Sequence, residues 1–194
     1  MAFLIGFTGP PQSGKDTSCD HLVSDHGYEK FSFADPIREA LLALDPWADS
    51  FLRVSEIVYR WGWDEAKTRW PEIRRLLQQL GCESGRTIHG ENVWVDLTMA
   101  KIIPKLKEGT NVCVSDVRFK NEVMALNRWG GIIVEVRRNV DTNPEILKHR
   151  SEVEAREIMP DISIHNHTDI PDFKKRLDRT VNRIHRMRRK SLVK

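Results

Sequence analysis

The chain has 194 residues, of which 40% are hydrophobic and 30% are charged, and its formal net charge is +3. This composition is typical of a globular protein with one substantial core, and it excludes a disordered chain. No apolar run approaches the ~20 residues that a membrane-spanning helix needs, and the start of the chain lacks the basic segment of a signal peptide. Three well-separated cysteines without C-x-x-C spacing indicate reduced thiols. We therefore expect a cytoplasmic protein with no membrane partner.

Short apolar runs alternate with amphipathic segments along the chain. The apolar runs predict strands near residues 2–7, 28–33, 112–116, 131–136 and 162–164. The amphipathic segments predict helices near residues 14–24, from 35, at 71–81, 91–106 and 122–129, and over a terminal stretch with an apolar stripe of Phe173, Leu177, Val181 and Ile184. Gly81 is expected to end the helix that Pro71 begins. This alternation predicts an α/β fold, in which a parallel sheet carries helices on both faces.

A glycine-containing turn follows the first predicted strand. Residues 9–15 fit the pattern G-x-x-x-x-G-K between a strand and a helix, which is typical of a P-loop. Glycines let backbone N–H groups converge on phosphate oxygens, and the following helix directs its positive end at the same anion. Lys15 adds a point charge for the β- and γ-phosphates. The residues expected to bind ATP here are Gly9, Gln12, Ser13, Gly14, Lys15, Asp16 and Thr17.

Two carboxylates and a hydroxyl are candidates for the Mg²⁺ that accompanies ATP. Asp16 stands where most P-loops have Ser or Thr, and Thr17 supplies a hydroxyl one residue later. Asp116 ends an apolar strand, where P-loop enzymes keep a metal-associated acid. Arg118, two residues further on, is a candidate to contact a phosphate. The alternative is a helix-capping acid beside a surface arginine.

A segment from Asn139 to Pro160 shows no core pattern and is rich in basic residues. The basic residues in and beside it are Arg137, Arg138, Lys148, Arg150 and Arg156. Kinases of small molecules need a mobile lid that excludes water and neutralises charge on the transferring phosphoryl group. We expect a lid at approximately 138–160, with Arg138 and Arg150 over that group. A solvated loop is the alternative.

The acceptor of the phosphoryl group also has candidate residues. Arg38 and Arg86 are candidates to hold a monophosphate, Trp94 to stack on a base, and Asp35 to bind substrate at the end of the second predicted strand. Two alternatives remain open at this point. Arg38 can simply pair with Glu39 or Asp35, and Trp94 can be a core residue, as aromatic residues on an apolar helix face commonly are.

Several segments of the chain, in order, resemble phage-type deoxynucleoside monophosphate kinases. The P-loop with its Gly-Lys-Asp-Thr ending is one of them, and the run SDVRFKNE at 115–122 is the most specific. The remaining segments are 31–36, 85–86 with 92–94, and 149–152. The run Ile164-His165-Asn166 matches the end of the family's sequence, and the resemblance implies that Asn166 lies near the adenine of ATP.

The resemblance implies a P-loop NTPase fold with a five-stranded parallel sheet. It also implies transfer of the γ-phosphate of ATP, with Mg²⁺, to a deoxynucleoside 5′-monophosphate. We expect one domain over residues 1–194, with a helical insertion on the substrate side at approximately 45–108. The expected partners are small molecules, and the location is the host cytoplasm if a phage encodes the chain. The base, the sugar and a homodimer are left open.

Two other functions are left open. One is a P-loop kinase of another small acceptor, such as dephospho-coenzyme A or phosphomevalonate, and the segment Asp116–Glu122 argues against it. The other is a non-catalytic nucleotide-binding or nucleic-acid-binding module that uses the basic residues from Arg183 to Lys194. A solvated helix end explains that charge more simply, so we do not expect nucleic acid as a partner. His165 and His167 lack a nearby third ligand, so they do not predict a metal site.

Overall fold

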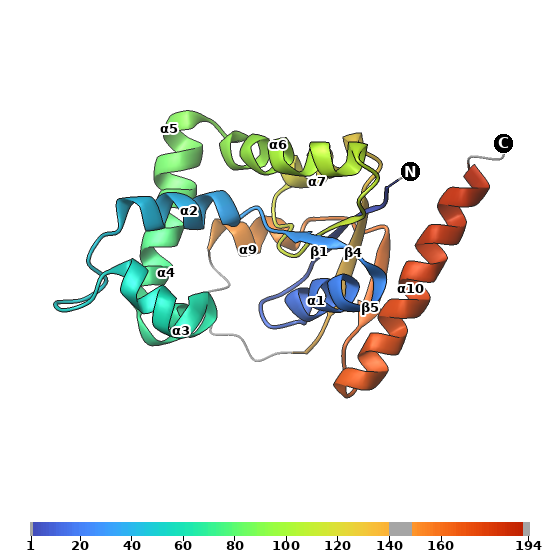
Figure 1. Ribbon diagram of the computed structural model, residues 1–194, viewed down its shortest axis with the longest axis horizontal. Coiled ribbons are helices and arrows are strands. Elements are labelled where there is room, and N and C mark those ends of the chain that lie inside the picture. Colours follow the sequence, from blue (N-terminus) through green and yellow to red (C-terminus); the bar gives the residue numbers. More distant parts are fainter. Residues whose placement is uncertain (1, 140–148, 192–194) are drawn as a thin grey trace. The chain divides into compact units, whose positions relative to one another are not determined.

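The computed structural model describes residues 2–139 and 149–191, with side chains as far as residue 187. Its strands are β1 (Leu4–Thr8), β2 (Glu29–Phe31), β3 (Val112–Val114), β4 (Ile132–Arg137) and β5 (Ile162–His165). Its helices are α1 (Lys15–His26), α2 (Asp35–Leu44), α3 (Val54–Arg69), α4 (Pro71–Gln78), the π-helical η1 (Gln79–Arg86), α5 (Thr87–His89), α6 (Val93–Lys107), α7 (Lys120–Arg128), α9 (Arg150–Ala155) and α10 (Ile170–Ser191). Figure 1 shows these elements along the chain.

The described strands form one five-stranded sheet in the order β2-β3-β1-β4-β5, and all neighbours are parallel. The register places Ile5 of β1 beside Cys113 on one side and Ile132 on the other. The predicted α/β class and parallel sheet are therefore confirmed. Because all strands point the same way, the residues directly after β1, β3 and β4 lie at one edge of the sheet, where α/β proteins bind ligands.

Helices cover both faces of this sheet, as predicted. Ile5 and Phe7 of β1 are buried in a core shared with α1 and α10, whose apolar stripe includes Phe173 and Leu177. Successive strand residues point to opposite faces, so Gly6 faces the other way. A Cβ atom at Gly6 would lie 2.6 Å from Leu126 of α7, which shows how closely that helix approaches the second face.

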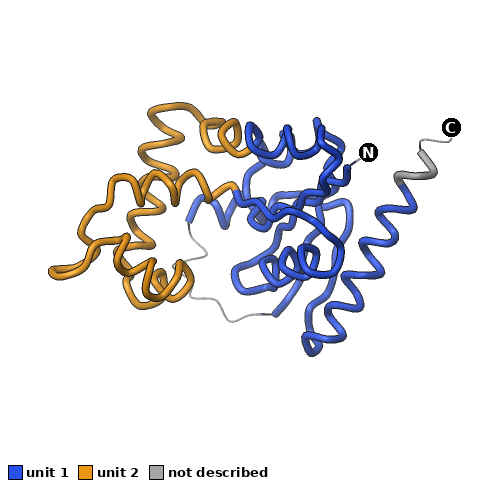
Figure 2. Tube along the Cα trace, viewed as in Figure 1, with its two compact units in different colours: residues 1–32, 99–194 blue, residues 33–98 orange. Residues whose placement is uncertain are grey.

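The chain divides into two compact units (Figure 2). Unit 1 comprises Met1–Ser32 and Met99–Lys194 and contains the sheet. Unit 2 is Phe33–Thr98 and is built from α2, α3, α4, η1, α5 and the first residues of α6. Unit 2 has its own apolar core, which includes Leu41, Ile57 and Ile73. Each unit thus has the buried apolar surface that a stable fold needs.

The prediction that Gly81 ends a helix is wrong. The helix that Pro71 begins continues through Gly81 as η1 and α5, and it stops before Gly90, whose φ of 104° breaks the helix. Gly81 instead serves close packing, because a Cβ atom there would lie 3.1 Å from Ile37 Cδ1. A glycine inside a helix and a glycine that caps one look alike in sequence, and only the packing partner distinguishes them.

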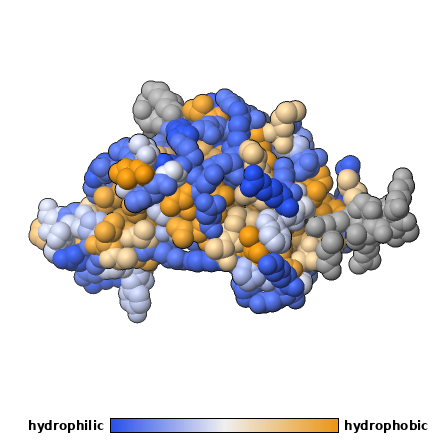
Figure 3. Space-filling view, turned by 90° about the horizontal axis from the view of Figure 1, so that it is seen from above, coloured by the Kyte–Doolittle hydropathy of each residue, from blue (hydrophilic) through white to orange (hydrophobic). Residues whose placement is uncertain are grey.

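None of the described helices is long and apolar enough to cross a membrane. On the face that Figure 3 draws, hydrophilic residues make up most of the surface, and hydrophobic residues appear as separate patches between them.

Candidate active site

The loop between β1 and α1 has a backbone that only glycine tolerates at two positions. Gly9 has a φ of 131° and Gly14 a φ of 110°. A Cβ atom at Gly9 would lie 2.4 Å from the carbonyl oxygen of Val136, and one at Gly14 would lie 2.6 Å from Asn166 Nδ2. Gln12, between them, also has a positive φ of 59°. These turns produce the tight, concave loop that a phosphate-binding backbone requires.

Lys15, the first residue of α1, is almost fully buried beneath this loop. Its ammonium group donates hydrogen bonds to the carbonyl oxygens of Gly9 (2.8 Å) and Pro10 (2.6 Å). Burial and the nearby charge of Arg118 lower the pKa of Lys15 from 10.5 to about 8. The cation is therefore held inside the loop by backbone carbonyls, in a place where an anion would stabilise its charge.

Three predicted site residues, together with Glu152, influence the charge of Lys15. Arg118 lowers its pKa, whereas the carboxylates of Glu152, Asp16 and Asp116 raise it. The structure thus brings together residues from the loops after β1 and β3, as expected from their positions after parallel strands. Glu152, which belongs to α9, is a member of this group that the sequence did not indicate as a site residue.

A buried hydroxyl in the loop fits the binding of a phosphate. Ser13 Oγ is buried and has no hydrogen-bond partner among the described residues, and the same is true of Thr8 Oγ1 at the end of β1. Buried hydroxyls are nearly always hydrogen-bonded in native proteins, so such groups suggest an absent ligand. The first turn of α1 also presents unpaired backbone N–H groups and the positive end of the helix dipole. This arrangement suits a multiply charged anion.

Asn166, expected near the adenine of ATP, holds the backbone of the loop in this structure. It is buried, and its Nδ2 donates to the carbonyl oxygen of Ser13 (2.7 Å). Its own backbone N–H donates to the carbonyl oxygen of Arg137 (2.7 Å), directly after β5. Asn166 therefore ties the end of the sheet to the phosphate loop.

The candidate metal ligands have different surroundings. Asp116 accepts a hydrogen bond from Ser32 Oγ (2.7 Å), whereas Asp16 is exposed and pairs with Lys30 (2.9 Å). Burial raises the pKa of Asp16, but the hydrogen bond and charge of Lys30 outweigh it, so the net pKa lies below the ordinary value. Thr17 is half-buried beside Asp16. Carboxylate and hydroxyl oxygens are ligands that Mg²⁺ prefers, so the donor set fits that ion.

Arg118 is oriented by two acidic residues. Its guanidinium pairs with the buried carboxylate of Glu152, and its backbone N–H donates to Glu122 Oε2 (2.7 Å). Glu122 also caps the first turn of α7 through the N–H of Phe119. The segment 149–152, which resembles the kinase family, could have indicated Glu152. Its pairing with Arg118, 34 residues away in the sequence, has no local pattern that predicts it.

The other predicted lid arginines are more exposed. Arg138 follows β4 and is exposed, while Arg137 beside it pairs with Glu135 (2.6 Å). Arg150, at the start of α9, pairs with Glu154 (2.7 Å), and its guanidinium lies 5.7 Å from the ring centre of Phe119. Arg156, directly after α9, is exposed. Residues 140–148 of the expected lid, Lys148 included, lie outside the described residues.

The four acceptor-side candidates all belong to unit 2. Arg38 pairs with Asp35 (3.0 Å), and its guanidinium lies 5.8 Å from the ring centre of Trp63. Arg86 is deeply buried, and its Nη1 donates to the carbonyl oxygen of Glu91 (2.7 Å). Arg86 is also the last residue of the π-helical η1, and such helices are frequent at functional sites.

Trp94 is buried against glycine. Its indole N–H donates to the carbonyl oxygen of Gly81 (2.7 Å), and a Cβ atom at Gly85 would lie only 2.3 Å from the indole ring. Gly85 is therefore required for the ring to fit beside η1.

Comparisons with known proteins agree with this geometry. A family model described as deoxynucleotide monophosphate kinase matches residues 49–177. A protein of Acanthamoeba polyphaga mimivirus, named as a proposed deoxynucleotide monophosphate kinase, is 30% identical over 187 residues, covering 88% of this chain and 91% of that protein. The uncharacterized protein ORF77 of Ictalurid herpesvirus 1 is 30% identical over 175 residues, covering 89% of this chain and 68% of that protein.

The fold also has a counterpart among solved structures. TT1252 from Thermus thermophilus superposes with a TM-score of 0.52 and 17% identity, over 93% of this chain and 96% of that one. The parallel sheet, the phosphate loop and the buried lysine define the class of P-loop kinases, which are phosphotransferases. Within that class, the chain belongs to the deoxynucleotide monophosphate kinase family.

Proposed function

We propose that this protein transfers the γ-phosphoryl group of ATP to a deoxynucleoside 5′-monophosphate, yielding ADP and the deoxynucleoside diphosphate. The observation that carries the proposal is the phosphate loop, with its buried Lys15 and the unpartnered hydroxyl of Ser13, in a chain of this kinase family. ATP is the co-substrate that such a loop and such a family require.

The nucleotide side of the reaction uses the loop after β1. The backbone N–H groups of the loop, which Pro10 and Pro11 lack, hold the triphosphate. Lys15 exchanges its hydrogen bonds to the carbonyl oxygens of Gly9 and Pro10 for hydrogen bonds to phosphate oxygens. Asn166 keeps the loop in shape through Ser13 and lies on the path expected for the adenine. Because Lys15 is already buried in the loop, its charge is in place before ATP binds.

Asp16, Thr17 and Asp116 are the residues that would hold Mg²⁺. When bound, this ion neutralises charge on the β- and γ-phosphates and fixes their orientation. Ser32 orients the carboxylate of Asp116 through its hydrogen bond. Lys30 balances the negative charge of Asp16 in the absence of a cation.

The transferring phosphoryl group is stabilised by cations. Lys15 and Arg118 are held near each other, and Glu152 fixes the orientation of Arg118. Arg138 and Arg150 complete this set as residues of a lid at approximately 138–160. No strong base is required, because the attacking phosphate oxygen is already anionic. Catalysis then rests on positioning and charge stabilisation.

Asp35, Arg38, Arg86 and Trp94 bind the acceptor within the helical segment at approximately 45–108 and the helix before it. The buried guanidinium of Arg86 is the strongest candidate for the acceptor phosphate, since arginine matches phosphate oxygens with paired N–H groups. Arg38 supplies a second cation beside Asp35.

The test is a coupled ADP-release assay with MgATP and a panel of acceptors. The panel contains dGMP, dTMP, dCMP and dAMP, their ribose counterparts, dephospho-coenzyme A and phosphomevalonate. Lys15→Ala tests the phosphate loop, and Lys175→Ala, at an exposed lysine of α10, is the matched control. We expect turnover of one or more deoxynucleotides in the wild type and the control, and its loss in Lys15→Ala.

Turnover of another acceptor alone would contradict the proposed substrate but would agree with a kinase activity. Protein that binds ATP but turns over no acceptor would contradict the proposal.

A further inference from the structure

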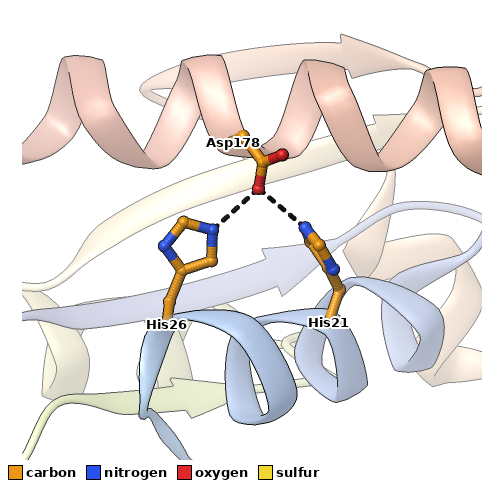
Figure 4. A group of neighbouring side chains, drawn as sticks. All are labelled: His21, His26 and Asp178. Atoms are coloured by element: carbon orange, nitrogen blue, oxygen red, sulfur yellow. Dashed lines mark hydrogen bonds and ion pairs between the residues drawn. The ribbon is translucent and has the colours of Figure 1, made fainter.

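Three side chains that take no part in the proposed reaction converge near the C-terminal end of α1 (Figure 4). His21 and His26 both lie on α1, and Asp178 lies on α10. Nε2 of His21 and Nε2 of His26 are each 2.7 Å from the same carboxylate oxygen of Asp178. One ligand atom from each residue lies within 4.8 Å of the other two.

Apolar packing holds this cluster in place. Leu22 and Leu177, the neighbours of His21 and Asp178 in sequence, are buried together with Val181 in the core between α1, α10 and the sheet. His21 itself is 3% exposed, whereas Asp178 is 41% exposed. The three polar groups are thus prepositioned by the fold, and one side of the cluster remains open to solvent.

One ring nitrogen of His21 lacks a hydrogen-bond partner among the described residues. If Nε2 carries the proton that Asp178 accepts, Nδ1 is left as a buried atom with no hydrogen-bond partner among the described residues. A metal ion on Nε2 would move that proton to Nδ1. There it would face the carboxylate of Asp25, whose Oδ1 lies 3.5 Å away. A carboxylate behind a ligating histidine is the usual support of such a ligand.

We propose that His21, His26 and Asp178 form a binding site for Zn²⁺ that joins α10 to α1. Two imidazoles and a carboxylate, with a fourth position open to water, suit Zn²⁺. Mg²⁺ prefers oxygen ligands, so it is a poor competitor. The site is separate from the phosphate loop, because His21 and His26 lie about 9 Å and about 16 Å along α1 from Lys15 at the rise of an α-helix. The proposal does not rest on the proposed function.

Binding of Zn²⁺ would stabilise the fold. The two histidines and the aspartate are 157 and 152 residues apart in sequence, so an unfolded chain offers no comparable site. A ligand that binds only the folded state raises the midpoint of thermal unfolding in proportion to the logarithm of its concentration.

The experiment is calorimetric titration of Zn²⁺ into chelator-treated full-length protein in excess Mg²⁺, with Co²⁺ absorption as a second readout. We expect one equivalent to bind the wild type, and affinity to fall at least ~10-fold in Asp178→Asn and His26→Gln. Asp25→Asn should weaken binding about 10-fold through the second carboxylate. The matched control changes His165 and His167, an exposed pair 3.4 Å apart, to glutamine and should leave affinity unchanged.

Four outcomes would overturn the proposal. They are absence of Zn²⁺ binding to the wild type, unchanged affinity in Asp178→Asn, loss of binding in the His165 and His167 control, and a sulfur-to-cobalt band that disappears in Cys82→Ser. Asp178→Asn keeps an oxygen that accepts both hydrogen bonds, so it is expected to fold even if His26→Gln does not. Absence of binding would leave the cluster as a hydrogen-bonded link between two helices.

Discussion

Each unit of this protein buries a cation, and the two are held in different ways. Lys15 of unit 1 is 7% exposed, and Arg86 of unit 2 is 4% exposed. Lys15 donates to carbonyls of the loop immediately before it, and the loop takes its shape from two glycines with positive φ. Arg86 lies at the end of a π-helical segment, beside Gly85, which accommodates the ring of Trp94.

The two environments differ in how far a short sequence motif describes them. The Lys15 environment is made by backbone within a few residues, so a short motif describes it. The Arg86 environment depends on how Trp94 packs against Gly85, so the sequence indicated Arg86 as a candidate but not that its side chain is buried. The two cations should therefore respond differently to substitution, to pH and to changes in their neighbours.

Lys15→Met should lower kcat/KM about 10³-fold, because it removes a preorganised charge from the transferring phosphoryl group. The fold should be retained, since a buried ammonium is replaced by an apolar side chain of similar length. Steady-state kinetics and thermal unfolding measure both effects. The control Lys175→Met should resemble the wild type. Activity within tenfold of the wild type in Lys15→Met would show that the loop is not the catalytic site.

The pH dependence of stability should carry the signature of Lys15. Its pKa is about 8 in the folded protein and 10.5 when exposed, so between these values the unfolded state binds more protons. The free energy of unfolding therefore rises with pH across this window, by on the order of 3 kcal/mol. Below pH 8, Lys15 is charged in the folded protein, and the full cost of burying that charge lowers the free energy of unfolding.

Methionine does not titrate, so urea unfolding at pH 7, 8.5 and 10 should show Lys15→Met more stable than the wild type at pH 7. The gap should narrow toward pH 10. Parallel stability curves for the two proteins would refute the assignment of this effect to Lys15.

Arg86→Met should raise KM for the acceptor about 100-fold, the cost of one lost charge-assisted hydrogen bond, and leave KM for ATP nearly unchanged. Arg86→Lys keeps the charge and should recover part of the loss, because lysine cannot form paired N–H contacts. Initial-rate kinetics with each substrate varied in turn separate the two constants. Equal effects on the KM for the acceptor and the KM for ATP would contradict the assignment of Arg86 to the acceptor.

Gly85→Ala should destabilise the protein by about 2 kcal/mol, because the added methyl group would overlap the indole of Trp94. The matched control is Gly81→Ala, where the new Cβ atom would meet only the end of the Ile37 side chain at 3.1 Å. Alanine also suits a helix better than glycine, so the control should stay within about 1 kcal/mol of the wild type. Urea unfolding measures both, and equal losses would mean that Trp94 shifts freely.

Lys30→Met should have the smallest effect, below about 1 kcal/mol in unfolding free energy. Lys30 pairs with Asp16 and Asp20, and both carboxylates are largely exposed, so solvent screens the attraction. Urea unfolding of the variant beside the wild type gives the difference. A loss of unfolding free energy above about 2 kcal/mol would show that Lys30 contributes more than a solvent-screened surface pair does.

The class of fold and the local shape of the loop after β1 could be predicted from the sequence. Buried strands alternate with helices because the parallel sheet needs apolar residues on both faces, and the order of these elements is visible as a pattern. The phosphate loop is contiguous, so Gly9, Gly14 and Lys15 are recognisable without their surroundings. The residues Asp116 and Arg118 follow a strand, and the rule for parallel sheets places them at the same edge as the loop.

Which distant side chains are in contact is apparent only in the folded structure. Helix α3 lies within the helical insertion expected at approximately 45–108, but the sequence does not predict its bounds, because Gly62, with a φ of 70°, interrupts its helical pattern. The role of Gly81 depended on its neighbour Ile37.

Contacts between residues far apart in the sequence could not be predicted from the sequence either. Asn166 reaches Ser13 across 153 residues, and His21 reaches Asp178 across 157. Local backbone preferences act over a few residues and leave a mark in the sequence. Contacts between distant side chains form only when the sheet and its helices pack, so no short pattern encodes them.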